Sequence, residues 1–159
     1  MHFTDKTQYP IIAKLGVFIP IIVVLFSFIA ADELLTIVFW SIILAVVLFA
    51  TWYMFCTKLL LKGSEQGIYY QLKPFQKKKV FLPFNEILEL EIEATDFLTK
   101  FGGWGKRKKG NEKAYVFNDG YFLKVKTDTR TYYFSISDQS KQQWEDWINK
   151  NFSKLNINS

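Results

Sequence analysis

Two long uncharged apolar segments near the N-terminus constrain this chain more than any other feature. Residues 15–31 read LGVFIPIIVVLFSFIAA and residues 34–57 read LLTIVFWSIILAVVLFATWYMFCT. Each approaches the roughly 20 apolar residues that cross a bilayer as a helix, the first once it extends back past a snorkelling Lys14. The sequence predicts two membrane-spanning helices, at about 11–31 and 34–57, and Pro20 predicts a kink in the first.

A cleaved signal peptide is the alternative interpretation of the first apolar segment. Lys6 and Lys14 precede it, and it ends in small residues, as a signal peptide does. However, Phe28 and Ile29 occupy the positions where the cleavage motif places a small residue. A retained hairpin of two antiparallel helices is the prediction, because only ADE separates the two segments.

The charges that flank the apolar segments predict the orientation of this hairpin. Its turn carries Asp32 and Glu33 and no basic residue, whereas four lysines lie on the other side: Lys6, Lys14, Lys58 and Lys62. The positive-inside rule then places both termini in the cytoplasm, as expected for a multi-pass protein of the inner (cytoplasmic) membrane. Cys56 is the single cysteine, so no intrachain disulfide forms.

From residue 58 onward the composition changes to that of a basic, strand-rich domain, predicted to span residues 58–155. It carries 18 Lys and Arg against 12 Asp and Glu, whereas residues 1–57, the N-terminal segment and hairpin, have a net charge of −1. Short aromatic and β-branched stretches separated by turn residues predict about seven antiparallel strands. These strands lie at 57–61, 67–73, 77–82, 87–94, 113–117, 121–127 and 131–137.

The last part of the chain changes to helical periodicity. Four apolar residues lie on one face of the predicted helix: Trp144, Trp147, Ile148 and Phe152. Leu155 extends this face, and Ser137 and Asp138 are candidates for its N-cap. Strands followed by one amphipathic helix predict a PH-like domain, a bent sheet or barrel closed by the C-terminal helix; the pattern alone also allows another small barrel.

The whole chain resembles a family of small bacterial membrane proteins that have two transmembrane helices and a PH-like domain. The similar segments are FTDKTQ, GIYYQLKPFQ, LPFNEI, FGGWGKR and AYVFNDGYFLKVKT. Two features depart from the family pattern: Lys106 stands where an aliphatic residue is usual, and SISDQS follows the last strand. The resemblance implies the fold and the membrane location, and it implies no activity.

A glycine-rich stretch, FGGWG at 101–105, suggests a sharply turning loop that fixes the direction of Trp104. The indole ring has two interpretations. It covers the open edge or mouth of the barrel, which is the favoured prediction, or it lies at the level of the lipid headgroups.

Two basic clusters are the candidate ligand-binding residues, together with Trp104. One is Lys106, Arg107, Lys108 and Lys109, with Lys113 beyond it, and the other is Lys77, Lys78 and Lys79. If both face the cytoplasmic leaflet, each cation contributes on the order of 1 kcal/mol of attraction to anionic lipid. The alternative is that the runs are simply solvated.

Three alternating glutamates, Glu89, Glu91 and Glu93, lie opposite Leu88, Leu90 and Ile92 in the predicted strand. They could hold a cation, but the stronger interpretation is that Lys124 and Lys126 balance them across the sheet. No metal site is predicted.

Other classes of function lack their residues. The only histidine is His2, so no histidine-dependent triad or zinc site is expected, and GGWG is not a phosphate-binding Walker motif. Nothing resembles a nucleic-acid recognition element. The prediction is a non-catalytic binding module without cofactors that contacts membrane lipids. The alternative is a membrane-anchored scaffold or regulatory subunit that binds a protein partner or a second copy of itself.

Overall fold

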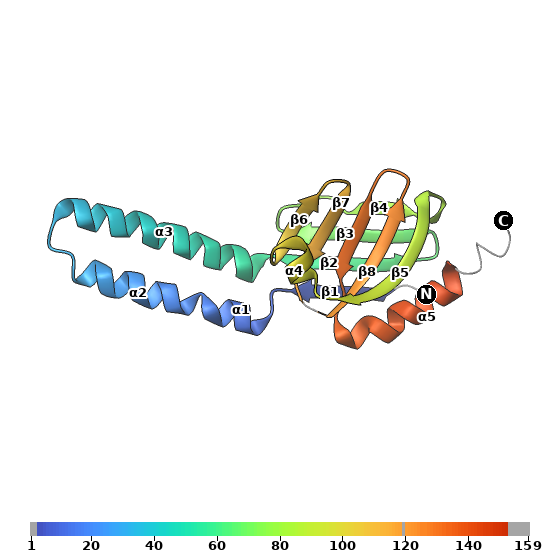
Figure 1. Ribbon diagram of the computed structural model, residues 1–159, viewed down its shortest axis with the longest axis horizontal. Coiled ribbons are helices and arrows are strands. Elements are labelled where there is room, and N and C mark those ends of the chain that lie inside the picture. Colours follow the sequence, from blue (N-terminus) through green and yellow to red (C-terminus); the bar gives the residue numbers. More distant parts are fainter. Residues whose placement is uncertain (1–2, 119, 153–159) are drawn as a thin grey trace. The chain divides into compact units, whose positions relative to one another are not determined.

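A computed structural model describes residues 3–118 and 120–152 of the chain, which divide into two units (Figure 1). The helical unit comprises residues 9–57. The β unit comprises residues 58–152 together with residues 3–8. The N-terminal segment, which the sequence analysis groups with the hairpin, therefore supplies a strand to the β unit.

The helical unit contains two helices long and apolar enough to cross a membrane. They span Ile11–Ile29 and Leu34–Cys56, with a mean hydropathy of 2.6 each. The second is one continuous helix, α3 (Leu34–Cys56), and it packs against α2 (Phe18–Ile29). The two predicted apolar helices are thus confirmed. Three of their side-chain hydroxyls are satisfied locally, since Ser27, Ser41 and Thr51 each donate to the carbonyl four residues earlier.

The first span is interrupted, as Pro20 predicts. Helix α1 (Ile11–Gly16) ends one residue before Val17, and α2 begins at Phe18. Proline has no N–H to donate and its ring crowds the carbonyl four residues earlier, which here belongs to Gly16. The break therefore lies where proline disrupts the hydrogen-bond ladder.

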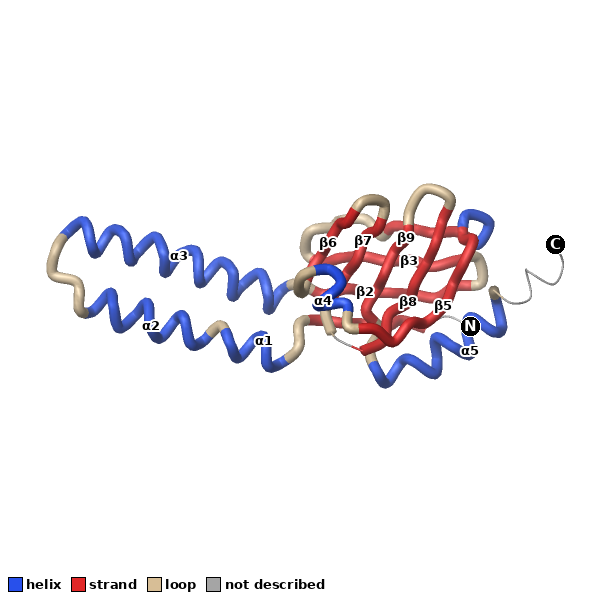
Figure 2. Tube along the Cα trace, viewed as in Figure 1, coloured by secondary structure: helices blue, strands red, loops and turns tan. Residues whose placement is uncertain are grey.

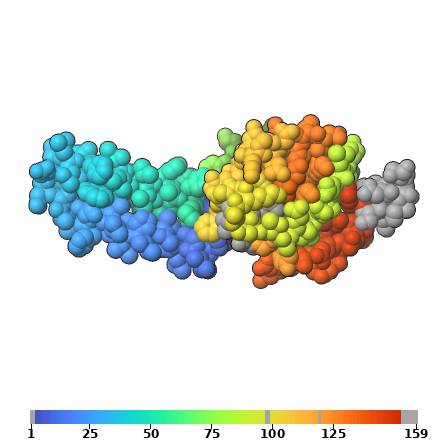
Figure 3. Space-filling model, in the orientation of Figure 1, coloured from blue at the N-terminus to red at the C-terminus, as the bar shows by residue number. Residues whose placement is uncertain are grey.

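The β unit consists of two sheets rather than one closed barrel. Sheet A has the strand order β1-β2-β3-β4, and sheet B has the order β5-β8-β9-β7-β6. The strands are β1 (Phe3–Gln8), β2 (Lys58–Ser64), β3 (Gly67–Lys73), β4 (Val80–Pro83), β5 (Ile87–Thr95), β6 (Gly105–Lys109), β7 (Glu112–Val116), β8 (Gly120–Thr127) and β9 (Thr131–Ser135). In Figure 2 sheet B lies in front of sheet A, and in Figure 3 its strands, coloured yellow-green to orange, form the visible face of the β unit.

This topology corrects the predicted fold in three respects. The sheets are not closed, two strands (β1 and β6) were not expected, and β7 runs parallel to β9. The parallel pair arises because the chain passes from β7 to β8 and then returns through β9, which lies between them. The broader expectation, a strand-rich unit with a C-terminal helix, is confirmed.

Aromatic side chains form the core between the two sheets. Tyr70 of sheet A has its ring centroid 5.4 Å from that of Tyr115 and 4.9 Å from that of Phe134, both in sheet B. Tyr115 and Phe134 stack at 5.2 Å. Burial raises the pKa of the Tyr70 and Tyr115 hydroxyls, so these side chains stay neutral and serve packing.

Helix α5 (Lys141–Asn151) carries the predicted apolar face. Trp144 and Trp147 are buried, and so is Phe152 just beyond the helix. The ring of Trp144 lies 4.6 Å from that of Phe3, and the ring of Trp147 lies 5.5 Å from that of Phe84. Leu155, the fifth expected member of this face, lies outside the described residues.

A buried carboxylate joins β1 to the start of α5. Asp5 accepts hydrogen bonds from the backbone N–H and the hydroxyl of Ser137, at 3.1 and 2.9 Å. It also accepts one from the hydroxyl of Ser140 at 2.6 Å and one from the indole N–H of Trp144 at 3.3 Å. The Ser137 side chain, predicted as a helix N-cap, makes no capping bond and instead binds Asp5.

Candidate functional site

The basic run of the glycine-rich stretch is an edge strand and not a loop. Residues 105–109 form β6, which lies at the edge of sheet B and, among the strands that the structure describes, pairs with β7 alone. All four cationic side chains of β6 are exposed. Lysines on an edge strand discourage another chain from pairing with its free N–H and C=O groups, so the run has a structural use that the sequence analysis did not consider.

The glycines before β6 adopt backbone angles that favour glycine, as expected. Gly102, Gly103 and Gly105 have φ values of +71°, +125° and +99°. They reverse the chain between the short helix α4 (Phe97–Phe101) and β6. The carbonyl of Gly103 accepts a hydrogen bond from Nε of Arg107 at 3.3 Å, which ties the loop to the strand that follows.

Trp104 packs onto the outer face of sheet B. It is half-buried against a cluster of apolar residues from α4 and three strands: Phe101, Ala114, Val116, Phe122 and Tyr133. Its indole N–H is buried and has no hydrogen-bond partner within the described residues. This placement favours the interpretation in which the ring covers part of the sheet, here its outer face and not a barrel mouth.

A basic hollow of about 590 Å³ lies between α4 and β6. It is lined by residues 99–102 and 106–109, which include five cationic residues and no carboxylate. Lys100, Arg107 and Lys109 contribute from the outer face of sheet B, since Arg107 pairs with Ala114 and Lys109 with Glu112. Asp96 precedes α4 and accepts hydrogen bonds from the backbone N–H and the hydroxyl of Thr99. These bonds fix the first turn of α4, which forms one side of the hollow. Lys100 is the cation of the hollow that sequence analysis missed, because it lies outside the charged run.

The second predicted cluster lies in the other sheet. Lys77, Lys78 and Lys79 are exposed in the loop that joins β3 to β4 of sheet A. Lys79 lines a separate pocket of about 360 Å³ that also contains Lys62, Tyr69 and Glu65. The two predicted basic clusters therefore line different pockets, and Lys62 is the cation that the structure adds to the second.

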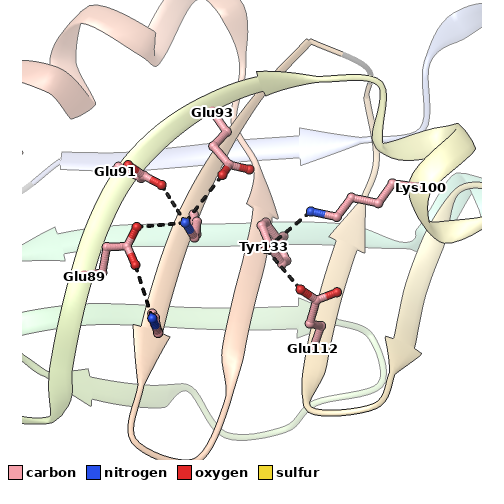
Figure 4. Close-up of polar contacts among 8 residues, drawn as sticks. Glu89, Glu91, Glu93, Lys100, Glu112 and Tyr133 are labelled. Carbon is pink, nitrogen blue, oxygen red and sulfur yellow. Dashed lines mark hydrogen bonds and ion pairs between the residues drawn. The ribbon is translucent and has the colours of Figure 1, made fainter.

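The acidic strand is balanced by lysines, as the sequence analysis favoured. Nζ of Lys124 lies 2.8, 2.6 and 3.5 Å from carboxylate oxygens of Glu89, Glu91 and Glu93 (Figure 4). Nζ of Lys126 lies 3.7 Å from Glu89. The hydrogen bond from Lys124 is the largest cause that holds the pKa of Glu89 below its usual range.

The expected alternation of this strand fails near its start, at Leu88. Leu90 is buried as predicted, whereas Leu88 is 57% exposed. The cause is a shift in the pairing of β5 with β8 between Ile87 and Glu89. Such a bulge turns the extra residue away from the face it would otherwise share.

A second polar group lies on the same outer face of sheet B. The hydroxyl of Tyr133 donates to Glu112 at 3.2 Å and accepts from Lys100 at 3.4 Å (Figure 4). Burial, followed by the charge of Glu112, raises the pKa of Tyr133 to about 12. The phenol is therefore neutral at physiological pH and is suited to hold Lys100 in place rather than to transfer a proton.

We expect Lys124→Met to lower stability at neutral pH by roughly 1 kcal/mol, because three carboxylates then lose their shared cation. The pKa of Glu89 is lowered in the folded state, so its stabilising effect exists above its unfolded pKa and disappears as pH falls through the folded value. The difference between wild type and variant should therefore be largest at neutral pH and shrink below about pH 4.

Thermal unfolding of the full chain in detergent, followed by circular dichroism at neutral pH and below about pH 4, measures the difference in stability between wild type and Lys124→Met. Lys126→Met is the matched control, since its ammonium is more exposed and lies near Glu89 alone. Equal effects of the two substitutions, or an effect that does not depend on pH, would contradict the role given to Lys124.

Neither protein-family models, nor characterised proteins, nor solved structures give a significant match to this chain.

Proposed function

We propose that this chain is an integral protein of the inner (cytoplasmic) membrane whose β unit is a non-catalytic module that binds anionic lipid headgroups. The observation that carries the proposal is the basic hollow between α4 and β6, to which Lys100, Arg107 and Lys109 bring cations from the outer face of sheet B and no lining residue brings a carboxylate. Anionic headgroups are the polyanions available to a domain tethered to a bilayer, and tethering makes even weak attraction effective.

The pairing of β1 with β2 supports the proposed topology of two membrane passes. Gln8, the last residue before the helical unit, pairs with Lys58, the first strand residue after it. Because β1 and β2 belong to one sheet, residues 3–8 and 58–64 must lie on the same side of a membrane. An even number of passes satisfies this condition, and the lysines on that side favour the cytoplasm for both termini.

Two packed sheets and a C-terminal helix also support a PH-like fold for the β unit. Its departures from the predicted arrangement are the open sheets, the added strands β1 and β6, and the parallel pair of β7 with β9. A PH-like fold hosts many activities, so the proposed function depends on the basic hollow and not on the fold.

Amine-reactive labelling of the full chain in nanodiscs, read residue by residue by mass spectrometry, tests lipid binding. We expect labelling of Lys100 and Lys109 to fall roughly fivefold when neutral phosphatidylcholine is partly replaced by anionic lipid, since about 1 kcal/mol acts on each cation near the surface. Physiological salt should restore part of the labelling. Lys150, exposed on α5, is the internal control.

The full chain is necessary because β1 belongs to the β unit, so a fragment that begins at residue 58 lacks an edge strand. A variant with Arg107 and Lys109, the outer-face cations of β6, replaced by glutamine should lose the lipid dependence at Lys100. Labelling that is equal in neutral and anionic nanodiscs would refute the proposal and favour the scaffold alternative. The surface gives that alternative little support, since the large apolar side chains exposed in the described β unit are Phe75 and Leu88.

A further inference from the structure

The strand conformation of β6 divides the basic run between the two faces of sheet B. Lys106 pairs with Tyr115 and Lys108 pairs with Lys113, whereas Arg107 pairs with Ala114. Directly paired residues of an antiparallel ladder point to the same face. Because Ala114 belongs to the outer cluster beneath Trp104 and Tyr115 packs against sheet A, Lys106 and Lys108 lie on the inter-sheet face.

Two further cations occupy this inter-sheet face beside them. Lys113 pairs in parallel register with Tyr132, and its ammonium lies 5.8 Å from the centroid of that ring. The Tyr132 ring lies 5.9 Å from that of Tyr70 in sheet A, which confirms the face. Arg130 lies in the turn before β9, and its charge acts on the hydroxyls of Tyr70 and Tyr115, which pack between the two sheets.

The four residues Lys106, Lys108, Lys113 and Arg130, here called the inter-sheet basic cluster, influence one another electrostatically. Burial is the largest cause that lowers the pKa of Lys113, and the charges of Arg130, Lys106 and Lys108 add to it. The cluster is therefore close enough for mutual repulsion to disfavour a protonated Lys113. Repulsion of this kind destabilises the folded protein unless an anion compensates it.

The described residues provide no such compensation. Within 3–118 and 120–152, ion pairs are formed by Lys124, Lys126 and Lys141, and none involves a member of the inter-sheet basic cluster. Glu112, the nearest carboxylate along β7, binds the Tyr133 hydroxyl on the outer face. The cluster thus combines one half-buried lysine, two exposed lysines and a guanidinium beside tyrosine rings at an edge where the sheets do not join.

We infer that the inter-sheet basic cluster binds a phosphate monoester. This inference deepens the proposed function, since it assigns a second site and a specific headgroup chemistry. A monoester carries close to two negative charges at neutral pH, whereas the phosphodiester of common anionic lipids carries one. Four cations without partners match the doubly charged group better, and the guanidinium of Arg130 offers the two parallel N–H groups that bind phosphate oxygens.

Labelling of Lys113 in the full chain reports directly on this site, because a free amine reacts and an ammonium does not. Nanodiscs contain phosphatidylcholine alone, or with phosphatidic acid as the monoester, or with phosphatidylglycerol as the diester. A fourth arm adds soluble glycerol phosphate to the neutral nanodiscs. An anion that raises the pKa of Lys113 by one unit slows its reaction about tenfold. We expect this slowing with a monoester and less than about twofold slowing with the diester.

Two variants locate the effect. Arg130→Gln should abolish the slowing at Lys113, whereas Arg107→Gln, on the opposite face of β6, should leave it unchanged. Circular dichroism of each variant confirms that it is folded, and the comparison of reaction rates is made within each variant. Slowing by glycerol phosphate but not by phosphatidic acid would assign the site to a soluble monoester.

The inference fails if the monoester and the diester slow Lys113 equally, or if Arg130→Gln keeps the effect. Its failure is distinct from that of the lipid proposal. Protection of Lys100 and Lys109 by any anionic lipid, without a specific effect at Lys113, would retain the basic hollow and reject the inter-sheet basic cluster as a site. Slowing of Lys113 by the soluble monoester alone, with no lipid effect at Lys100, would retain the inter-sheet basic cluster as a site and reject lipid binding by the basic hollow.

Discussion

Asp5→Ala should destabilise the β unit by about 3 kcal/mol or more, because four donors lose their shared buried acceptor. Asp5 is 5% exposed and joins β1 to Ser137, Ser140 and Trp144. Hydrogen bonds to a charged group are among the stronger ones, and the indole N–H of Trp144 would remain buried without a partner. Thermal unfolding of the full chain in detergent, followed by circular dichroism, should show Tm lowered by roughly 10 to 20 °C.

Two substitutions calibrate this result. Asp5→Asn keeps one acceptor oxygen in place of two and should lie between wild type and Asp5→Ala. Asp146→Ala removes an exposed carboxylate of α5 that accepts a hydrogen bond from Gln142 at 3.1 Å, and it should cost less than about 0.5 kcal/mol. If Asp5→Ala unfolded at the same temperature as Asp146→Ala, the docking of β1 onto the rest of the β unit would be refuted.

Gly67→Ala should be comparably severe, and for a reason of backbone geometry. Gly67 begins β3 with φ +152°, and a Cβ atom at this position would lie 2.1 Å from the backbone oxygen of Leu82 in β4. Relief requires β4 to move away from β3, which breaks the pairing of Gly67 with Pro83 and of Ile68 with Leu82. We expect a loss of about 3 kcal/mol or more in the free energy of unfolding, measured as for Asp5.

Gly110→Ala separates backbone strain from the steric clash. Gly110 lies in the turn between β6 and β7 at φ +57°, where an added Cβ meets no atom within 4 Å. Only the left-handed backbone is then unfavourable, at about 1 kcal/mol. A loss at Gly67 no larger than that at Gly110 would contradict the close approach of β3 and β4.

The helices and most strands were predictable because their own side chains encode their burial. The two apolar spans follow from composition, and the kink follows from Pro20. The alternation of Leu90 with its glutamate neighbours and the helical spacing of Trp144 and Trp147 likewise report buried faces directly.

The elements that were missed are those whose identity depends on a distant partner. Strand β6 contains no apolar residue, and it is a strand because β7 offers it a hydrogen-bonding edge. Strand β1 is largely polar, and its buried Asp5 and Thr7 acquire partners only in the folded β unit. Exposed edge strands carry little hydrophobic periodicity, so local patterns do not identify them.

The candidate sites were likewise predictable only where they depend on local sequence and not on tertiary structure. The presence of basic residues was readable, but their distribution was not, because strand alternation sends Arg107 to one face of sheet B and Lys106 to the other. Lys100 and Arg130 join their respective sites through tertiary structure alone. Neither is adjacent to the charged run in the sequence.

The position of β1 also imposes an order on biosynthesis. Residues 3–8 emerge from the ribosome before both apolar helices, whereas their partner strand β2 follows these helices in the chain. The donors to Asp5 come later still, 132 or more positions along the chain. Contacts between such distant segments form slowly, because a long loop must close before these contacts can stabilise the fold. Residues 3–8 are therefore translated before all of these partners and reach their native place late, and the β unit is completed only after Trp144 has been made.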